Sequence, residues 1–203
     1  MSKSVDAVVF DVGRVLYHWD LSNLLGQIEP DKAKLDRVLR DVITEEWHFQ
    51  HDRGVALADM VPARIAEFPE FEPHLNAYRT RFNETIPGPV PGSIELVERL
   101  HARGIPLFAI TNFGAEFWAG FRPTAPVFDL FDAIVVSGEE KLAKPDPAIF
   151  ALAAGRFGHA PSRMLFIDDN AANIAAAREE GWQVHHFHDA PTLEHDLDER
   201  GLL

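Results

Sequence analysis

Four short apolar runs constrain the fold of this chain more than any other feature of its sequence. They lie at 7–10, 105–110, 133–136 and 164–167, and each is followed by polar or glycine-containing residues. Because the runs are nearly continuous rather than alternating, they predict strands that are buried on both faces of a parallel sheet. A fifth strand is expected at 183–187.

Helical patterns separate the later runs. Residues 93–103 carry an apolar stripe at helical spacing and stop before Gly104, and residues 171–180 stop before Gly181. Glycine is the usual residue just past a helix end, so both segments have a defined C-terminus. Alternation of strand and helix in this order predicts an α/β fold with a doubly wound parallel sheet and right-handed crossovers.

The pattern changes between the first run and residue 93. Residues 18–87 contain several amphipathic helical patterns, such as 35–43, and no convincing strand. The segment 87–92 has three prolines and two glycines, which marks a return to the sheet. We therefore expect a helical cap domain inserted after the first strand. The predicted domains are a core at 1–17 and 88–203 and a small cap at 18–87.

Composition excludes some classes of partner. The 203 residues include 32 acidic and 19 basic side chains, a formal net charge of −13. That balance disfavours nucleic acid or an anionic membrane as a partner. The absence of cysteine removes thiolate zinc sites. The first apolar run is too short for a signal peptide and no run approaches the length of a membrane span, so a cytoplasmic protein is expected.

Polar side chains follow the apolar runs at the expected strand ends. Ligands of open α/β sheets bind outside the carboxyl ends of the strands, so these side chains are expected to line one cleft. In chain order the cleft would receive Asp11, then Thr111 with Asn112, then Lys144, and finally Asp168 with Asp169.

These four segments, in this order, resemble the signature motifs of the haloacid dehalogenase-like (HAD) hydrolases. The match spans residues 6–187, and the helical insert resembles the α-helical cap of the subfamily that includes β-phosphoglucomutase and small-molecule phosphatases. The resemblance implies a Rossmann-like core and a phosphatase that acts on a small phosphorylated metabolite. It also implies that Asp11 is the nucleophile and forms an aspartyl-phosphate that water hydrolyses.

The resemblance implies a Mg²⁺ site as well. Its ligands would be Asp11, the backbone carbonyl of Gly13 and Asp169, with Asp168 as a direct or indirect partner. Physical chemistry agrees, because three carboxylates in one cleft need a cation unless some are protonated. Oxygen ligands together with a substrate phosphate suit Mg²⁺.

The remaining motif residues would handle the phosphoryl group. Thr111 and the backbone around Asn112 are expected to hydrogen-bond a phosphate oxygen, and Lys144 to neutralise the nucleophile and the transferring group. Arg14 is a further expected substrate contact.

Gly13 departs from the pattern of the family. Its phosphatases usually carry a second Asp there, which protonates the leaving group and activates water. Loss of such a group typically costs ~10²–10⁴-fold in rate. Either the substrate has a good leaving group, such as an anomeric sugar phosphate, or another side chain substitutes. The candidates are Arg14, His18 and His48.

Gly13 also keeps two other interpretations open. The first is a 2-haloacid dehalogenase, in which Asp11 would displace halide at carbon without the help of an acid. Arg14 could then pair with the substrate carboxylate. The acidic pair Asp168 and Asp169 disfavours this interpretation, because a dehalogenase of this kind needs no metal site. The second is a degenerate module that binds a phosphorylated ligand or a protein with little turnover. The acidic pair could also simply cap the helix that begins near residue 171.

Overall fold

One parallel sheet forms the centre of the protein, as the apolar runs predict. The structure is a computed structural model that describes residues 4–203. Its five strands lie in the order β3-β2-β1-β4-β5, which confirms the doubly wound α/β fold. The strands are β1 Ala7–Phe10, β2 Leu107–Thr111, β3 Ala133–Val136, β4 Met164–Asp168 and β5 Gln183–His186.

The second strand lies slightly later than its apolar run. It begins at Leu107 rather than at Ile105 and extends to Thr111. The backbone N–H of Ile105 donates to Leu100 O at 3.1 Å and so closes the preceding helix. Pro106 has no N–H to give to the sheet. The shift places Thr111 at the carboxyl edge, beside the other strand ends.

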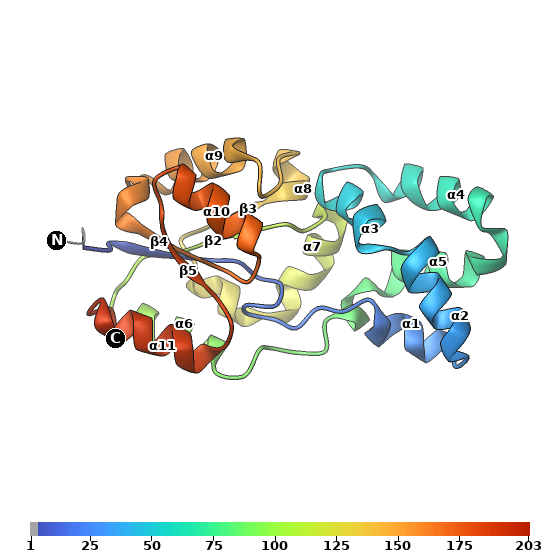
Figure 1. Ribbon diagram of the computed structural model, residues 1–203, viewed down its shortest axis with the longest axis horizontal. Coiled ribbons are helices and arrows are strands. Elements are labelled where there is room, and N and C mark those ends of the chain that lie inside the picture. The colour runs from blue at the N-terminus through green and yellow to red at the C-terminus, as the bar shows by residue number, and fades with distance from the viewer. Residues whose placement is uncertain (1–3) are drawn as a thin grey trace.

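Helices cover both faces of the sheet. Alternate strand residues point to opposite faces, so Val8 and Phe10 pack with α6 and α11, whereas Ala7 and Val9 pack with α9 and α10. Figure 1 shows α9 and α10 on one side of the strands and α6 and α11 on the other. These four helices are α6 Ser93–Ala102, α9 Pro147–Phe157, α10 Ala171–Glu179 and α11 Ala190–Glu199.

Between β1 and α6 the described chain is helical and contributes no strand to the sheet. In Figure 1 these helices gather beyond the carboxyl ends of the strands. The domain boundaries at 17/18 and 87/88 remain a proposal. The elements are α1 Ser22–Ile28, α2 Lys32–Arg37, a π-helical turn Val38–Val42, α3 Glu45–Asp52, α4 Leu57–Glu67, the 3-10 helix Pro69–Phe71, α5 Glu72–Arg81 and the 3-10 helix Phe82–Thr85.

Two short helices of the sheet-containing part face this helical segment. They are α7 Ala115–Phe121 and α8 Ser137–Glu140. The backbone N–H of Leu57 donates to Glu116 Oε1 at 3.1 Å, and the Ser137 hydroxyl donates to Asp52 O at 2.5 Å. Within the described residues, no helix has the length and apolarity needed to cross a membrane.

The core packing gives a first prediction. Phe150 on α9 is fully buried and lies edge-to-face with Phe166 of β4, with ring centroids 5.4 Å apart. Phe150→Ala should lower the free energy of unfolding by about 3–5 kcal/mol, because it removes buried apolar area and leaves a cavity. Urea denaturation measures the change. The control Val55→Ala, at a side chain 40% exposed, should change stability by less than about 0.5 kcal/mol; equal effects would contradict the packing.

Candidate active site

Asp11 lies directly after β1, where the backbone turns away from the sheet. The backbone N–H of Val12 donates to Asp11 Oδ1 at 2.7 Å. The loop then closes on itself, because the N–H groups of Leu16 and Tyr17 both donate to Val12 O. This turn fixes the Asp11 carboxyl at the sheet edge, where it lines a cavity.

Lys144 is the buried cation of the site. Its Nζ lies 2.9 Å from Asp11 Oδ1 and 2.7 Å from Asp168 Oδ2, and the residue is only 1% exposed. Burial by itself lowers the pKa of this ammonium group, but the charges of Asp11 and Asp168 outweigh that effect and raise it. Lys144 is therefore held as a cation between two carboxylates.

Asn112 holds the backbone of Lys144. Its Nδ2 donates to Lys144 O, and its Oδ1 accepts from the Lys144 N–H, both at 2.9 Å. Both ends of the amide are used in this way, so a substrate contact through this side chain remains a prediction. The two bonds tie the segment after β3 to the end of β2.

The two acidic residues at the end of β4 have different environments. Asp168 is fully buried and accepts from the backbone N–H of Asn170, from Nδ2 of Asn173 and from Lys144 Nζ. Asp169 lines the cavity and is partly exposed. Asn170 caps α10, since its side chain accepts from the N–H of Ala172. The acidic pair does not serve as this helix cap.

The acidic side chains could hold a metal ion. Asp11, Asp168 and Asp169 each offer an oxygen, and these oxygens lie within 4.8 Å of one another. Three carboxylates against one ammonium group leave an excess of negative charge. Burial, followed by the charges of Asp168 and Asp169, raises the pKa of Asp11 to about 7 although Lys144 acts in the opposite direction. Burial and Asp168 also raise the pKa of Asp169. A divalent cation with oxygen ligands fits this donor set.

Three other predicted residues lie at or near the same edge. Gly13 lines the cavity. Arg14 also lines it, with φ at +60°; it pairs with Glu45 at 2.5 Å and lies over the Trp19 ring. Thr111 is buried at the end of β2, and its Oγ1 has no hydrogen-bond partner among the described residues. A phosphate contact of Thr111 remains a prediction.

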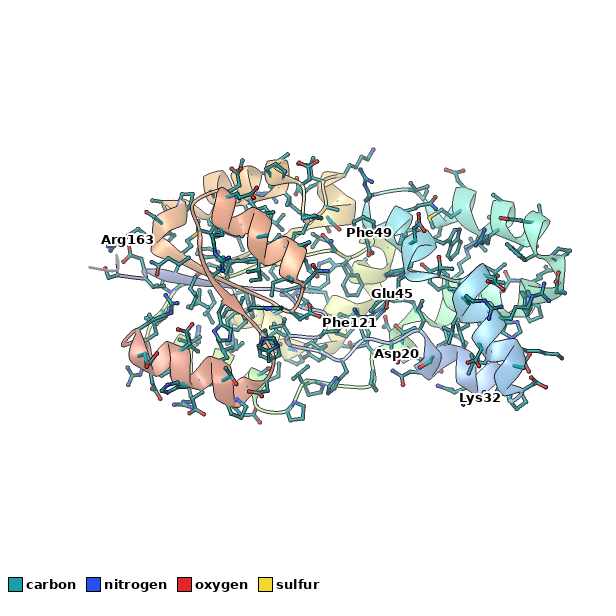
Figure 2. All side chains as sticks on the ribbon, in the orientation of Figure 1. Asp20, Lys32, Glu45, Phe49, Phe121 and Arg163 are labelled. Carbon is teal, nitrogen blue, oxygen red and sulfur yellow. The ribbon has the colours of Figure 1, made fainter. Side chains whose placement is uncertain are left out.

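The cavity lies between the strand ends and the helical segment and measures about 360 Å³. Asp11, Lys144 and Asp169 line it from the sheet side. In Figure 2, Glu45 and Phe49 of the helical segment and Phe121 of α7 lie in the middle of the molecule, where the two parts meet. From the helical segment the cavity receives aromatic side chains, among them Trp19, Phe49 and Phe82, and also the acidic side chains Glu45, Glu46 and Asp52.

His48, a predicted substitute for the missing acid, lies in the wall of this cavity. Its ring stacks on Trp19 and Phe82, with centroids 5.0 and 5.3 Å away, and Nδ1 lies 2.8 Å from the Tyr78 hydroxyl. Burial lowers the pKa of His48 to about 3. The imidazole is therefore neutral near pH 7 and is poorly suited to act as a general acid. His18, another predicted substitute, is exposed and lines the cavity.

Asp52, the last residue of α3, is a cavity residue that was not predicted from the sequence. Its carboxyl lines the cavity and is buried, with Oδ2 3.4 Å from His48 Nε2. Burial raises its pKa to about 7. The available signal was its spacing, because Asp52 follows His48 by four residues and so shares one face of the helix.

Comparisons with known proteins identify the family of this chain. A family model described as a haloacid dehalogenase-like hydrolase matches residues 5–181. The sesquiterpene phosphatase astK of Aspergillus oryzae is 24% identical over 190 residues, which cover 94% of this chain and 93% of that protein. The phosphoglycolate phosphatase of Escherichia coli is 31% identical over 91 residues, covering 45% and 36%.

Two further proteins match most of this chain, but only one of them is matched over its own full length. Acyl-CoA dehydrogenase family member 10 of mouse is 26% identical over 192 residues, covering 86% of this chain; the chain spans only 17% of that protein. The crystal structure of the HAD family enzyme bt-2542 of Bacteroides thetaiotaomicron, a magnesium complex, superposes with a TM-score of 0.75. It is 20% identical, with 96% of this chain and 99% of that chain covered.

The buried ion pairs predict a stability effect. Lys144→Met should lower the free energy of unfolding by about 3–5 kcal/mol at neutral pH, because two carboxylates lose their cation. Urea denaturation measures the loss. The matched control is Lys141→Met at an exposed lysine, which should cost less than about 0.5 kcal/mol. A similar small cost for both variants would contradict the pairing.

Asp52 predicts a pH dependence of stability. Its pKa rises from 3.8 to about 7 on folding, so the folded chain binds more protons between these values. Its contribution is fully present below about pH 4 and is lost as the pH rises through 7. Relative to Asp52→Asn, the wild type should therefore lose up to about 4 kcal/mol across this range. Denaturant titrations at several pH values measure the difference. Asp59→Asn, at an exposed aspartate, should show no such trend.

Proposed function

The chain belongs to the haloacid dehalogenase-like hydrolase family, and from this premise we propose that it is a magnesium-dependent phosphatase of a small phosphorylated metabolite. The main support is the placement of the Asp11 carboxyl, which lines the cavity. Lys144 Nζ lies 2.9 Å from Asp11 Oδ1, and Asp169 lies beside them. A nucleophile, a cation and a free carboxylate therefore meet where a phosphoryl group can enter.

The proposed Mg²⁺ ligands are Asp11, Asp169 and the backbone carbonyl of Gly13. When bound, the ion neutralises charge on the phosphoryl oxygens and orients the group for in-line attack. Asp168 is better suited to support the metal site without binding the ion itself, because both of its oxygens already accept hydrogen bonds. Its charge holds Lys144 in place and keeps that ammonium group protonated.

Asp11 would attack phosphorus with a carboxylate oxygen while the bond from phosphorus to the ester oxygen breaks. Lys144 favours the ionised form of Asp11 and neutralises the transferring group. Thr111 Oγ1, a buried hydroxyl without a partner among the described residues, is the proposed donor to a phosphate oxygen. Arg14 is a proposed contact to substrate at the cavity mouth. Water then releases phosphate from the aspartyl-phosphate.

The helical segment is the proposed cap that selects the leaving group. A cavity of about 360 Å³ admits a small organic phosphate. Its aromatic rings, such as Trp19 and Phe82, favour a leaving group with an apolar surface. The relatives named as phosphatases support phosphate ester chemistry, whereas their individual substrates are not carried over.

One assay panel tests this function against the two alternatives. With Mg²⁺, the wild type should release phosphate from p-nitrophenyl phosphate, EDTA should stop the release, and Asp11→Asn should lower it at least about 10³-fold because the nucleophile is lost. Asp59→Asn is the control for the same chemical change at an exposed site.

Two other results would overturn the proposal. Halide release from a 2-haloacid that is insensitive to EDTA would indicate a dehalogenase. Binding of phosphorylated metabolites without any turnover would indicate a degenerate module.

A further inference from the structure

Position 13 leaves open space beside the nucleophile. Gly13 lines the cavity, and a Cβ built there would have no heavy atom within 4 Å outside its chain neighbours. Hydrolysis of a phosphate ester with a poor leaving group is accelerated by a proton for the leaving oxygen and a base for the attacking water. Gly13 can supply neither, so for such a substrate both come from another group at the cavity.

Asp52 is placed to transfer these protons from the side of the cavity that the helical segment forms. It lines the same cavity as Asp11 but belongs to α3 of the helical segment. The residue is 5% exposed, and its Oδ1 is buried without a hydrogen-bond partner among the described residues. Oδ2 lies 3.4 Å from His48 Nε2, so one oxygen has a neighbour and the other is left for a ligand.

The backbone at the end of α3 is fixed to the strand ends. The Ser137 hydroxyl donates to Asp52 O at 2.5 Å. A Cβ built at Gly114 would lie 1.9 Å from the His51 ring, so only glycine permits this approach. These contacts hold Asp52 over the site through the first residues after β2 and β3.

The protonation of Asp52 suits a group that acts in both directions. Burial raises its pKa to about 7, the nearby Gly114 backbone N–H opposes that, and the charge of Asp11 adds to it. The other titratable groups that face it are His48 on the same helix and Tyr78 on α5. Near neutral pH both forms of the carboxyl are populated, as acid and base catalysis require.

The other cavity residues fit this task less well. His48 is neutral and bonded to Tyr78, and Arg14 is paired with Glu45. Glu45, Glu46 and His18 are exposed to solvent. Among the cavity-lining groups of residues 4–203, Asp52 combines burial, a free oxygen and a raised pKa.

We propose that Asp52 is the general acid and general base of this enzyme, in place of the carboxyl that Gly13 lacks. The proposal rests on the phosphatase function proposed above. It assigns proton transfer to the helical segment and phosphoryl transfer to the strand ends.

The proposed reaction has two steps. In the first, an oxygen of Asp11 bonds to phosphorus, the ester P–O bond breaks, and the protonated Asp52 gives its proton to the leaving oxygen to form an alcohol. In the second, the Asp52 carboxylate takes a proton from water as the water oxygen bonds to phosphorus. The bond between phosphorus and Asp11 breaks, phosphate leaves, and Asp52 is again protonated.

The test compares leaving groups in wild type, Asp52→Asn and the control Asp59→Asn. Substrates are p-nitrophenyl phosphate, phenyl phosphates with less acidic phenols, and an alkyl phosphate, all with Mg²⁺. Asp52→Asn should lose about 10²–10⁴-fold in kcat/KM on the alkyl phosphate. It should lose far less on p-nitrophenyl phosphate, whose leaving group departs without a proton. Asp59→Asn should match the wild type throughout.

The outcomes separate the two proposals. If the wild type releases no phosphate from any of these substrates, the phosphatase function itself fails. If the wild type is active but Asp52→Asn shows the same loss on every substrate, or none, Asp52 is not the acid. A uniform loss with a lower unfolding temperature would indicate a structural role instead.

A measurement on the unaltered protein covers the case in which Asp52→Asn does not fold. The wild-type kcat/KM for the alkyl phosphate should fall as the pH rises and Asp52 loses its proton. The value for p-nitrophenyl phosphate should fall much less over the same range. Identical pH profiles for the two substrates would overturn the assignment.

Discussion

One buried ammonium group determines how the strand ends are arranged. Lys144 Nζ lies 2.9 Å from Asp11 and 2.7 Å from Asp168, and its side chain has no solvent contact. A buried charge persists only when it is paired, so β1, β4 and the segment after β3 must meet at this point. Asn112 adds the end of β2 by bonding both backbone groups of Lys144. The interaction that joins four chain segments therefore also positions the Asp11 carboxyl.

Three consecutive residues at the end of β4 have different roles in this arrangement. Asp168 neutralises Lys144, Asp169 lines the cavity, and Asn170 caps α10. The division follows from burial, because the residue at the strand end points into the protein while the next one points toward the cavity. A carboxylate surplus remains at the cavity, and this surplus makes a divalent cation the natural counterion.

The helical segment does more than cover the site. Gly114 and Ser137 bring the end of α3 against the strand ends, and the cavity forms between them. Asp52 and His48 are both buried, and this burial shifts their pKa values in opposite directions. The pKa of the carboxyl rises and that of the imidazole falls, because burial disfavours the charged form of each. The same desolvation therefore makes Asp52 a proton donor near neutral pH and His48 a neutral ring.

The sequence alone determined the sheet, the ends of α6 and α10, and the placement of Asp11, Lys144 and the acidic pair on segments that end or follow the strands, because apolar runs and glycine stops are local signals. It also showed that Gly13 stands where the phosphatases of the family usually carry a second Asp. Tertiary structure alone decided that the Asn112 side chain hydrogen-bonds the backbone of Lys144 and that Asp52 lines the cavity. Neither could be read from spacing, since both depend on which surfaces of distant segments come into contact and how far they exclude water.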